Sequence, residues 1–186
     1  MYRCCCFIIL LEISICCRFP MLFSVQKSTL SFPDRAPLKI RVDVTVKSTP
    51  SQIWNVLMDH PRWVEWYEGV TSCEDTSPPG KEGLPGSSRR VTVNGLQSQE
   101  EFIALVPGKI WAFSVFETNA PLCHKWVERL VLEPTQEGGT HIIYEAGLEL
   151  RWLGKFLQPT IVKAVKDAWG KSLGRLDAYI ERINQK

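Results

Sequence analysis

Apolar and polar residues alternate in the segment KIRVDVTV at residues 39–46, which predicts a strand with one buried face. The segment TPSQIWNVLMD at residues 49–59 has a proline near its start and apolar residues spaced along one helix face. A second, shorter helical turn is expected around residues 62–66. The body of the chain is therefore expected to begin with one strand and two short helices.

Six further segments alternate in the same way and are separated by short turn sequences. Asn94-Gly95 is a strong signal for a two-residue hairpin, and Pro107-Gly108 marks the next turn. Because short loops join consecutive strands in antiparallel order, the sequence predicts an antiparallel sheet of about seven strands. The six segments are VTSCE, SRRVTV, QSQEEFIALV, KIWAFSVFE, KWVERLVLEP and THIIYEAGLEL.

The last segment of the chain has the clearest helical period, with one core-facing side and one charged side. Gly170 and Gly174 fall on the charged side. Pro159 is expected to break or kink the helix, so that the short apolar segment 153–157 needs another surface to cover, as a lip or a lid. The predicted core face comprises Ile161, Val165, Ala168, Trp169, Ser172, Leu176, Ile180 and Ile183.

The distribution of charge argues against a nucleic-acid partner. The formal net charge is +2, from 22 Lys and Arg residues against 20 Asp and Glu residues. Residues 1–38 hold four of the basic and two of the acidic residues, so residues 39–186 hold 18 of each. A neutral body without a basic stripe does not suit a phosphate backbone.

The cysteines and histidines indicate neither a metal site nor a cofactor. Five of the seven cysteines lie in the first 17 residues, which leaves Cys73 and Cys123 in the body. No C-x-x-C pair accompanies these two, so reduced thiols are expected rather than metal ligands, a nucleophile or a disulfide. His60, His124 and His141 have no spacing typical of ligation and are expected at the surface.

Residues 1–38 are expected to form an amino-terminal extension outside a domain that spans residues 39–186. The stretch MYRCCCFIILLEISICCRFP is too short and too broken to span a bilayer, and it lacks the cleavage pattern of a signal peptide. Its clustered cysteines suit palmitoylation, and the stretch MLFSVQKSTLSFPDRAP has a composition like that of a transit peptide. Disorder or targeting is favoured for the extension, which leaves the compartment open between the cytoplasm and an organelle.

Four stretches of the body carry a family resemblance: VTVKSTPSQIWNVLMD, WVEWYEGV, LPGSSRRVTVNG and EPTQEGGTHIIYE. Together they span nearly all of residues 40–184, and they resemble the polyketide cyclase/dehydrase-like branch of the START and birch-pollen-allergen (SRPBCC) superfamily. The resemblance implies an α+β, helix-grip fold, in which a curved antiparallel sheet wraps around a long carboxy-terminal helix. It also implies a cavity between sheet and helix that takes hydrophobic small molecules.

Aromatic side chains are expected to supply most of the wall of this cavity. Trp54 is expected in the core, whereas Trp63 and Trp66 share one face of the short helix. These two rings either stack on a ligand or close one end of the interior. The residues expected to line the site are Trp63, Trp66, Arg89, Val91, Trp111, Phe113, Trp126, Glu128, Leu130, Tyr144, Phe156, Val165 and Trp169.

Glu128 is the main polar candidate. Alternation in KWVERLVLEP places it on the same face as the large apolar residues of that segment. If this face lines the cavity, burial raises the pKa of Glu128 unless an arginine pairs with it. Arg89 and Tyr144 would complete a polar cluster. The alternative is that Glu128 lies outward in a surface ion pair of little consequence.

These expectations favour a protein that binds or transports a hydrophobic small molecule, lipid-like or polyketide-like. The alternative is a cyclase or dehydratase of the same architecture, with Glu128 or Tyr144 as general acid or base. The sequence lacks G-x-S-x-G, H-E-x-x-H and phosphate-loop motifs, which favours a carrier over an enzyme. A third hypothesis is a protein-interaction module whose cavity is filled.

Overall fold

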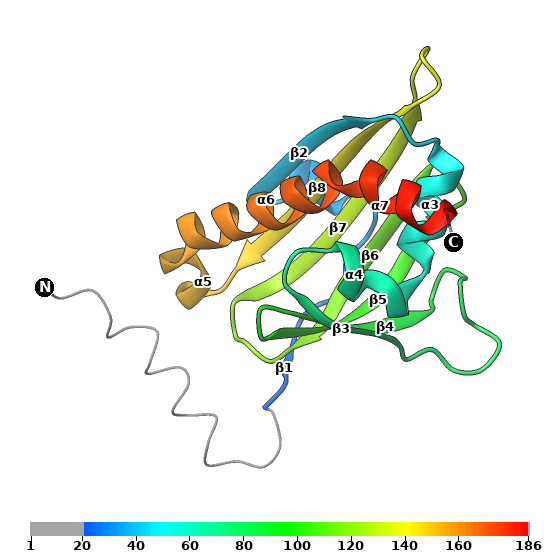
Figure 1. Ribbon diagram of the computed structural model, residues 1–186. Helices are drawn as coiled ribbons and strands as arrows, with labels where there is room; N and C mark the ends of the chain where they lie inside the picture. Colours follow the sequence, from blue (N-terminus) through cyan, green and yellow to red (C-terminus); the bar gives the residue numbers. More distant parts are fainter. Residues whose placement is uncertain (1–20, 186) are drawn as a thin grey trace, which may run out of the picture.

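A computed structural model describes residues 21–185 as a curved antiparallel sheet with its longest helix on its concave side (Figure 1). The sheet order is β2-β8-β7-β6-β5-β4-β3, and the short strand β1 pairs with β6. The elements in chain order are β1 (Phe23–Ser24), α2 (Phe32–Arg35), β2 (Leu38–Val46), α3 (Pro50–Met58), η1 (His60–Arg62), α4 (Trp63–Trp66), β3 (Val70–Asp75), β4 (Ser88–Val93), β5 (Leu96–Val106), β6 (Ile110–Thr118), β7 (Cys123–Pro134), β8 (Thr140–Leu150), α5 (Trp152–Phe156), α6 (Gln158–Gly174) and α7 (Leu176–Asn184).

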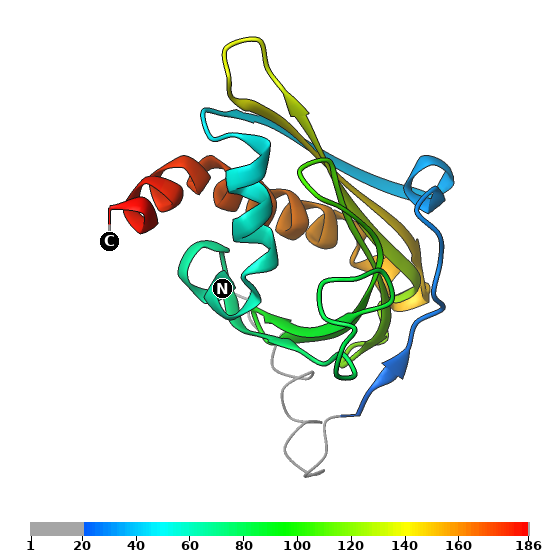
Figure 2. The same ribbon diagram turned by 90° about the vertical axis from the view of Figure 1, so that its right-hand side faces the viewer.

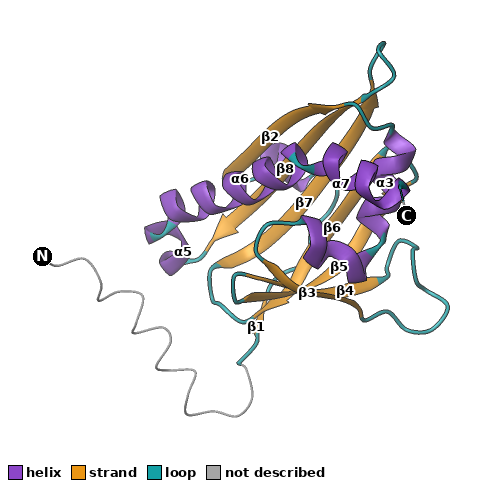
Figure 3. Cartoon of the chain, in the orientation of Figure 1, coloured by secondary structure: helices purple, strands orange, loops and turns teal. Residues whose placement is uncertain are grey.

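The predicted helix-grip order is confirmed. Seven long strands form the sheet, two short helices follow the first of them, and α6 crosses the concave face (Figure 2; Figure 3). Helix α3 begins where the sequence indicates, because Thr49 and Gln52 form a capping box. The Thr49 hydroxyl accepts from the Gln52 backbone N–H, and the Gln52 side chain accepts from the Thr49 N–H at 2.9 Å.

The predicted carboxy-terminal helix is two helices rather than one. The first, α6, begins with Pro159 in its first turn, and a break at Arg175 separates it from α7. The Asp177 carboxylate accepts from the backbone N–H groups of Lys47 and Ser48 at 2.8 and 2.9 Å. These bonds join the start of α7 to the end of β2. No helix within residues 21–185 has the length and apolar content needed to cross a bilayer.

The prediction that residues 1–38 form one extension outside the fold is wrong for residues 21–38. Strand β1 pairs with the end of β6, and Phe32 of α2 is buried against Val127 on the convex face of the sheet. Sequence alternation missed this segment because it packs through one short strand and one turn of helix. The predictions for residues 1–20 lie outside the described residues.

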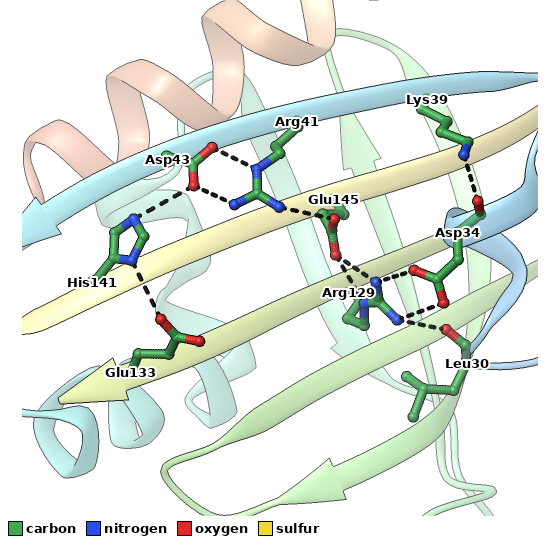
Figure 4. Close-up of polar contacts among 9 residues, drawn as sticks. All are labelled: Leu30, Asp34, Lys39, Arg41, Asp43, Arg129, Glu133, His141 and Glu145. Carbon is green, nitrogen blue, oxygen red and sulfur yellow. Dashed lines mark hydrogen bonds and ion pairs between the residues drawn. The ribbon is translucent and has the colours of Figure 1, made fainter.

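Ion pairs on the convex face of the sheet fasten this amino-terminal segment (Figure 4). The Arg129 Nη2 atom lies 2.6 Å from both the Asp34 carboxylate and the Glu145 carboxylate. Arg41 reaches the same Glu145 at 3.2 Å. Such partly exposed pairs contribute about 0.2–1 kcal/mol each, so their main consequence is positional. They place Arg129 on the face of β7 opposite to that of Glu128.

Candidate functional site

Adjacent strands bring five of the predicted site residues into two neighbouring rows on the concave face of the sheet. Trp111 pairs with Leu130, and Leu130 pairs with Tyr144; in the next row Phe113 pairs with Glu128. All five side chains are buried. The prediction that Glu128 faces the interior is therefore confirmed, and its alternative as an outward ion pair is excluded.

The short helix α4 and the long helix α6 close this face with further aromatic rings. The Trp63 ring centroid lies 5.1 Å from that of Trp66, 5.3 Å from Tyr67, 5.6 Å from Trp111 and 6.3 Å from Trp169. These are contact distances for stacked and edge-to-face aromatic pairs. In this structure the two tryptophans of α4 therefore belong to the core beneath α6.

Arg89 on β4 lies within this aromatic interior and is only 1% exposed. Its Nε atom donates to Glu100 of β5 at 2.7 Å, and Ser98 donates to the same carboxylate at 2.8 Å. The guanidinium also lies over the rings of Trp63 and Trp111, 4.0 and 4.7 Å from their centroids. Buried charges need such partners, because an unpaired charge in an apolar interior is strongly destabilising.

Glu128 differs from Glu100 because no arginine neutralises it. Its Oε1 atom accepts a hydrogen bond from Trp126 Nε1 at 2.9 Å. Burial, and then the nearby charge of Glu100, raise the pKa of Glu128 to about 8. Arg89 counteracts this only weakly, since its ion pair is with Glu100. At neutral pH Glu128 therefore carries a proton and can donate a hydrogen bond.

Three polar atoms of this aromatic interior are buried without a hydrogen-bond partner in the protein. They are Trp66 Nε1, Trp111 Nε1 and the hydroxyl oxygen of Tyr144. The Tyr144 ring stacks on Trp169 with centroids 4.3 Å apart. Burial and the neighbouring Glu128 raise the pKa of Tyr144 well above its usual value, yet the two groups make no hydrogen bond of normal geometry. This interior is therefore polar in places as well as aromatic.

The prediction that His60 lies at the surface is wrong. Pro61 and the η1 turn place the ring against the sheet, where it is 3% exposed and stacks on Phe102 at a centroid distance of 5.4 Å. Its Nδ1 atom lies 2.6 Å from Asp75 Oδ1. Burial and the charge of Arg89 lower the pKa of His60 to about 4, so the ring is neutral and donates to Asp75.

The remaining predicted lining residues do not all reach this interior. Val91 is buried in the core, while Trp126 and Val165 are half-buried and pack against it. Trp54, expected in the core, is also half-buried. Phe156 is 81% exposed on α5, so the prediction that it lines the interior is wrong.

The two described cysteines, Cys73 and Cys123, are free and buried, as expected. Burial raises the pKa of each thiol to about 12, which leaves little thiolate at neutral pH. Within residues 21–185, no group of three or more His, Cys, Asp or Glu side chains is placed to hold a metal ion.

Sequence reasoning missed Glu100, Phe102 and Tyr67, which all border the aromatic interior. Strand phase contained part of the signal, because Glu100 and Phe102 are two residues apart and share a face of β5. Gln99, directly before Glu100, is also buried, because a bulge shifts the register between these two residues. That irregularity cannot be recognised from alternation alone.

Two hollows of the described surface lie away from this interior. One, of about 160 Å³, separates α3 from α7, and the other, of about 330 Å³, adjoins α5. The space between the sheet and α6 is occupied by rings in mutual contact. A ligand cavity beneath α6 therefore stays a prediction. The hollow beside α5 is lined by Pro121, His124, Arg151, Trp152 and Leu153.

Comparison with known sequences places this chain in a family. The sequence model of the family described as "Polyketide cyclase / dehydrase and lipid transport" matches residues 37–181. Uncharacterized proteins of Mycobacterium bovis and Mycobacterium tuberculosis are 32% identical to the chain over 99 residues. The match covers 53% of this chain and 58% of each relative, so it spans little more than half of their length.

Solved structures share the fold at low sequence identity. An aromatase/cyclase from a Streptomyces species has a TM-score of 0.63 at 15% identity, covering 78% of this chain and 94% of its own. A START superfamily protein from Mycobacterium smegmatis has a TM-score of 0.59 at 12% identity, covering 78% of this chain and 98% of its own. At this identity the likeness concerns the fold alone.

Proposed function

This chain belongs to the polyketide cyclase/dehydrase and lipid transport family, and we propose that it binds a hydrophobic small molecule bearing oxygen groups between the sheet and α6. The apolar part of the ligand would contact the rings of Trp63, Trp111 and Trp169. Removing apolar surface from water contributes about 25 cal/mol per Å². The oxygen atoms of the ligand would accept hydrogen bonds from the buried polar groups.

The unpartnered polar atoms carry the proposal. A buried donor without an acceptor costs about 1–3 kcal/mol, and native proteins keep few of them. Here Trp66 Nε1, Trp111 Nε1 and the Tyr144 hydroxyl occur in one aromatic interior. An oxygen-bearing ligand in that interior would satisfy them. Because Glu128 holds its proton at neutral pH, it would donate to a ligand oxygen instead of repelling it.

Binding requires the rings to move apart, since those of Trp63, Trp111 and Trp169 are in contact. Each aromatic pair contributes about 0.5–1.5 kcal/mol beyond its buried area. A ligand that replaces these contacts with its own rings or chain offsets that cost. We therefore expect ligands of comparable apolar area, such as aromatic polyketides or lipids, rather than small polar metabolites.

The proposal is tested by titrating tryptophan fluorescence with a panel of fatty acids, sterols and aromatic polyketides, with native mass spectrometry as the second readout.

For a compound that binds, Tyr144→Phe removes one polar atom and keeps the ring. We expect its affinity to fall about fivefold to tenfold for the oxygenated compound and to stay unchanged for a hydrocarbon analogue. Tyr179→Phe, in the groove between α3 and α7, is the control and should not alter affinity. If no hydrophobic compound binds, a protein-interaction module with a filled interior replaces this proposal.

A cyclase or dehydratase is the second candidate, favoured by one observation. Glu128 has a pKa of about 8 beside a buried tyrosine hydroxyl, which suits a general acid or base that works near neutral pH. Glu128→Gln should then abolish turnover of a bound polyketide while its binding persists. Turnover that is unchanged in this variant removes Glu128 from a catalytic role.

A further inference from the structure

The end of the molecule formed by α5 exposes aromatic rings that the proposed interior does not use. Trp152 and Phe156 are each 81% exposed, the highest exposure of any large apolar side chain among residues 21–185. In Figure 1, α5 lies at the opposite end of the domain from α7. Isolated exposed apolar residues are common, but two aromatic rings side by side call for a partner.

Local geometry holds these two rings outward. Gly154 lies between them in the sequence and is buried, and a Cβ atom there would come within 2.0 Å of the Leu122 carbonyl oxygen. At 100° per residue, positions two before and two after Gly154 both fall on the opposite face of the helix. The close approach of Gly154 therefore fixes α5 with Trp152 and Phe156 pointing to solvent.

The charge around α5 is positive, although the body as a whole is neutral. Residues 150–166 contain Arg151, Lys155, Lys163 and Lys166 and no Asp or Glu. Lys163 pairs with Asp167, but no ion pair within residues 21–185 involves the other three cations. The exposed rings are thus accompanied by two cations, Arg151 and Lys155, that form no ion pair among the described residues.

The amino-terminal segment enters the fold at the same end. The Arg151 Nη2 atom donates to the carbonyl oxygen of Ser24 at 2.9 Å, and Gln26 donates to the carbonyl of His124 at 2.7 Å. Met21 and Leu22, which precede Ser24, are themselves exposed. Two exposed apolar side chains therefore directly precede the point where the amino-terminal segment contacts Arg151.

We propose that the α5 surface, formed by Trp152 and Phe156 with Arg151 and Lys155, docks on an anionic phospholipid membrane. Tryptophan and phenylalanine partition into the membrane interface, and lysine and arginine attract anionic headgroups. A second copy of the chain is a poorer partner, because a twofold contact would set this positive surface against itself. The inference does not rest on the proposed interior ligand.

Flotation of the full chain with lipid vesicles tests the proposal. Vesicles of phosphatidylcholine mixed with phosphatidylglycerol should bind the protein, and vesicles of phosphatidylcholine alone should bind it at least about tenfold more weakly. Added salt should release it. The double variant Trp152→Ser/Phe156→Ser should bind at least about tenfold more weakly than the unaltered chain, as should Lys155→Glu.

The matched control is Leu84→Ser/Val106→Ser, which removes two exposed apolar side chains away from α5 and should leave vesicle binding unchanged. Thermal unfolding checks that all variants remain folded. The proposal is overturned if the unaltered chain does not bind, if it binds both kinds of vesicle equally, or if the Trp152→Ser/Phe156→Ser variant binds as well as the unaltered chain. A dimer that this variant converts to a monomer would instead assign the surface to a second copy.

Discussion

Tryptophan occurs in two contrasting regions of this protein. Trp169 on α6 is buried, with its ring stacked on Tyr144 and in edge contact with Tyr67. Trp152 on α5 is 81% exposed, although only 17 positions separate the two residues. The contrast shows that the covering surface, and not the residue type, decides whether a ring stabilises the fold or is available to a partner.

Polar groups show the same contrast between the two regions. The interior holds Arg89 and Glu100 as a buried ion pair and a protonated Glu128. The α5 surface holds Arg151 and Lys155 without a carboxylate partner among residues 21–185. Buried charge must be neutralised within the protein, whereas exposed charge can remain free to attract an anionic surface.

The largest difference in the free energy of unfolding is expected when tryptophan is replaced by alanine in each of the two regions. Trp169→Ala should lower the free energy of unfolding by about 3–5 kcal/mol, because it removes a buried ring and leaves a cavity. Trp152→Ala should change it by about 0.5 kcal/mol or less, because its ring is already in water. Urea denaturation at equilibrium measures both. Similar losses in the two variants would mean that α5 is covered by the rest of the protein, contrary to the contrast described.

A smaller effect on the free energy of unfolding is expected from a change in pH. It tests the interior, because the two groups responsible, Glu128 and His60, are buried there. The folded-state pKa of Glu128 is raised from 4.5 to about 8, so between these values the folded protein keeps a proton that the unfolded chain has lost. Stability from this group therefore falls as pH rises through that window. For His60 the folded pKa is lowered from 6.5 to about 4, so its contribution rises with pH between those values.

The two trends oppose each other below pH 6.5, and above it only that of Glu128 remains. The free energy of unfolding should therefore fall by about 1–2 kcal/mol between pH 6.5 and pH 8. Glu128→Gln should remove this fall, while Glu149→Gln at an exposed ion pair should retain it. Urea denaturation at the two pH values provides the measurement, and an unchanged fall in Glu128→Gln would contradict the assignment.

The smallest effect is expected at the unpartnered hydroxyl of Tyr144. Tyr144→Phe removes a buried group that makes no hydrogen bond in the protein, so the free energy of unfolding should change by less than about 0.5 kcal/mol or rise. Ser98→Ala removes a buried hydroxyl that donates to Glu100 and should cost about 1–1.5 kcal/mol. Equal losses in thermal or urea denaturation would show that Tyr144 has a partner in the folded protein.

Local pattern was sufficient for much of the fold and part of the site. Period-two alternation identified the seven long strands and the inward phase of Glu128, and the 3.6-residue period identified most of the core face of α6 and α7. These signals are local, because a strand or helix that packs on one side must repeat its apolar residues with the period of its backbone. The inward position of Tyr144 follows from the same reasoning.

Tertiary structure alone decided which of these groups meet. Arg89 pairs with Glu100 rather than Glu128 because strand register and a bulge in β5 set their neighbours. His60 is buried because the η1 turn places it against β5, and Phe156 is exposed because Gly154 turns α5 the other way. The sequence by itself determined the periods of strands and helices, since these depend on neighbours along the chain. Only the folded chain determined which carboxylate is neutralised and which rings are covered, since these depend on contacts between residues far apart in sequence.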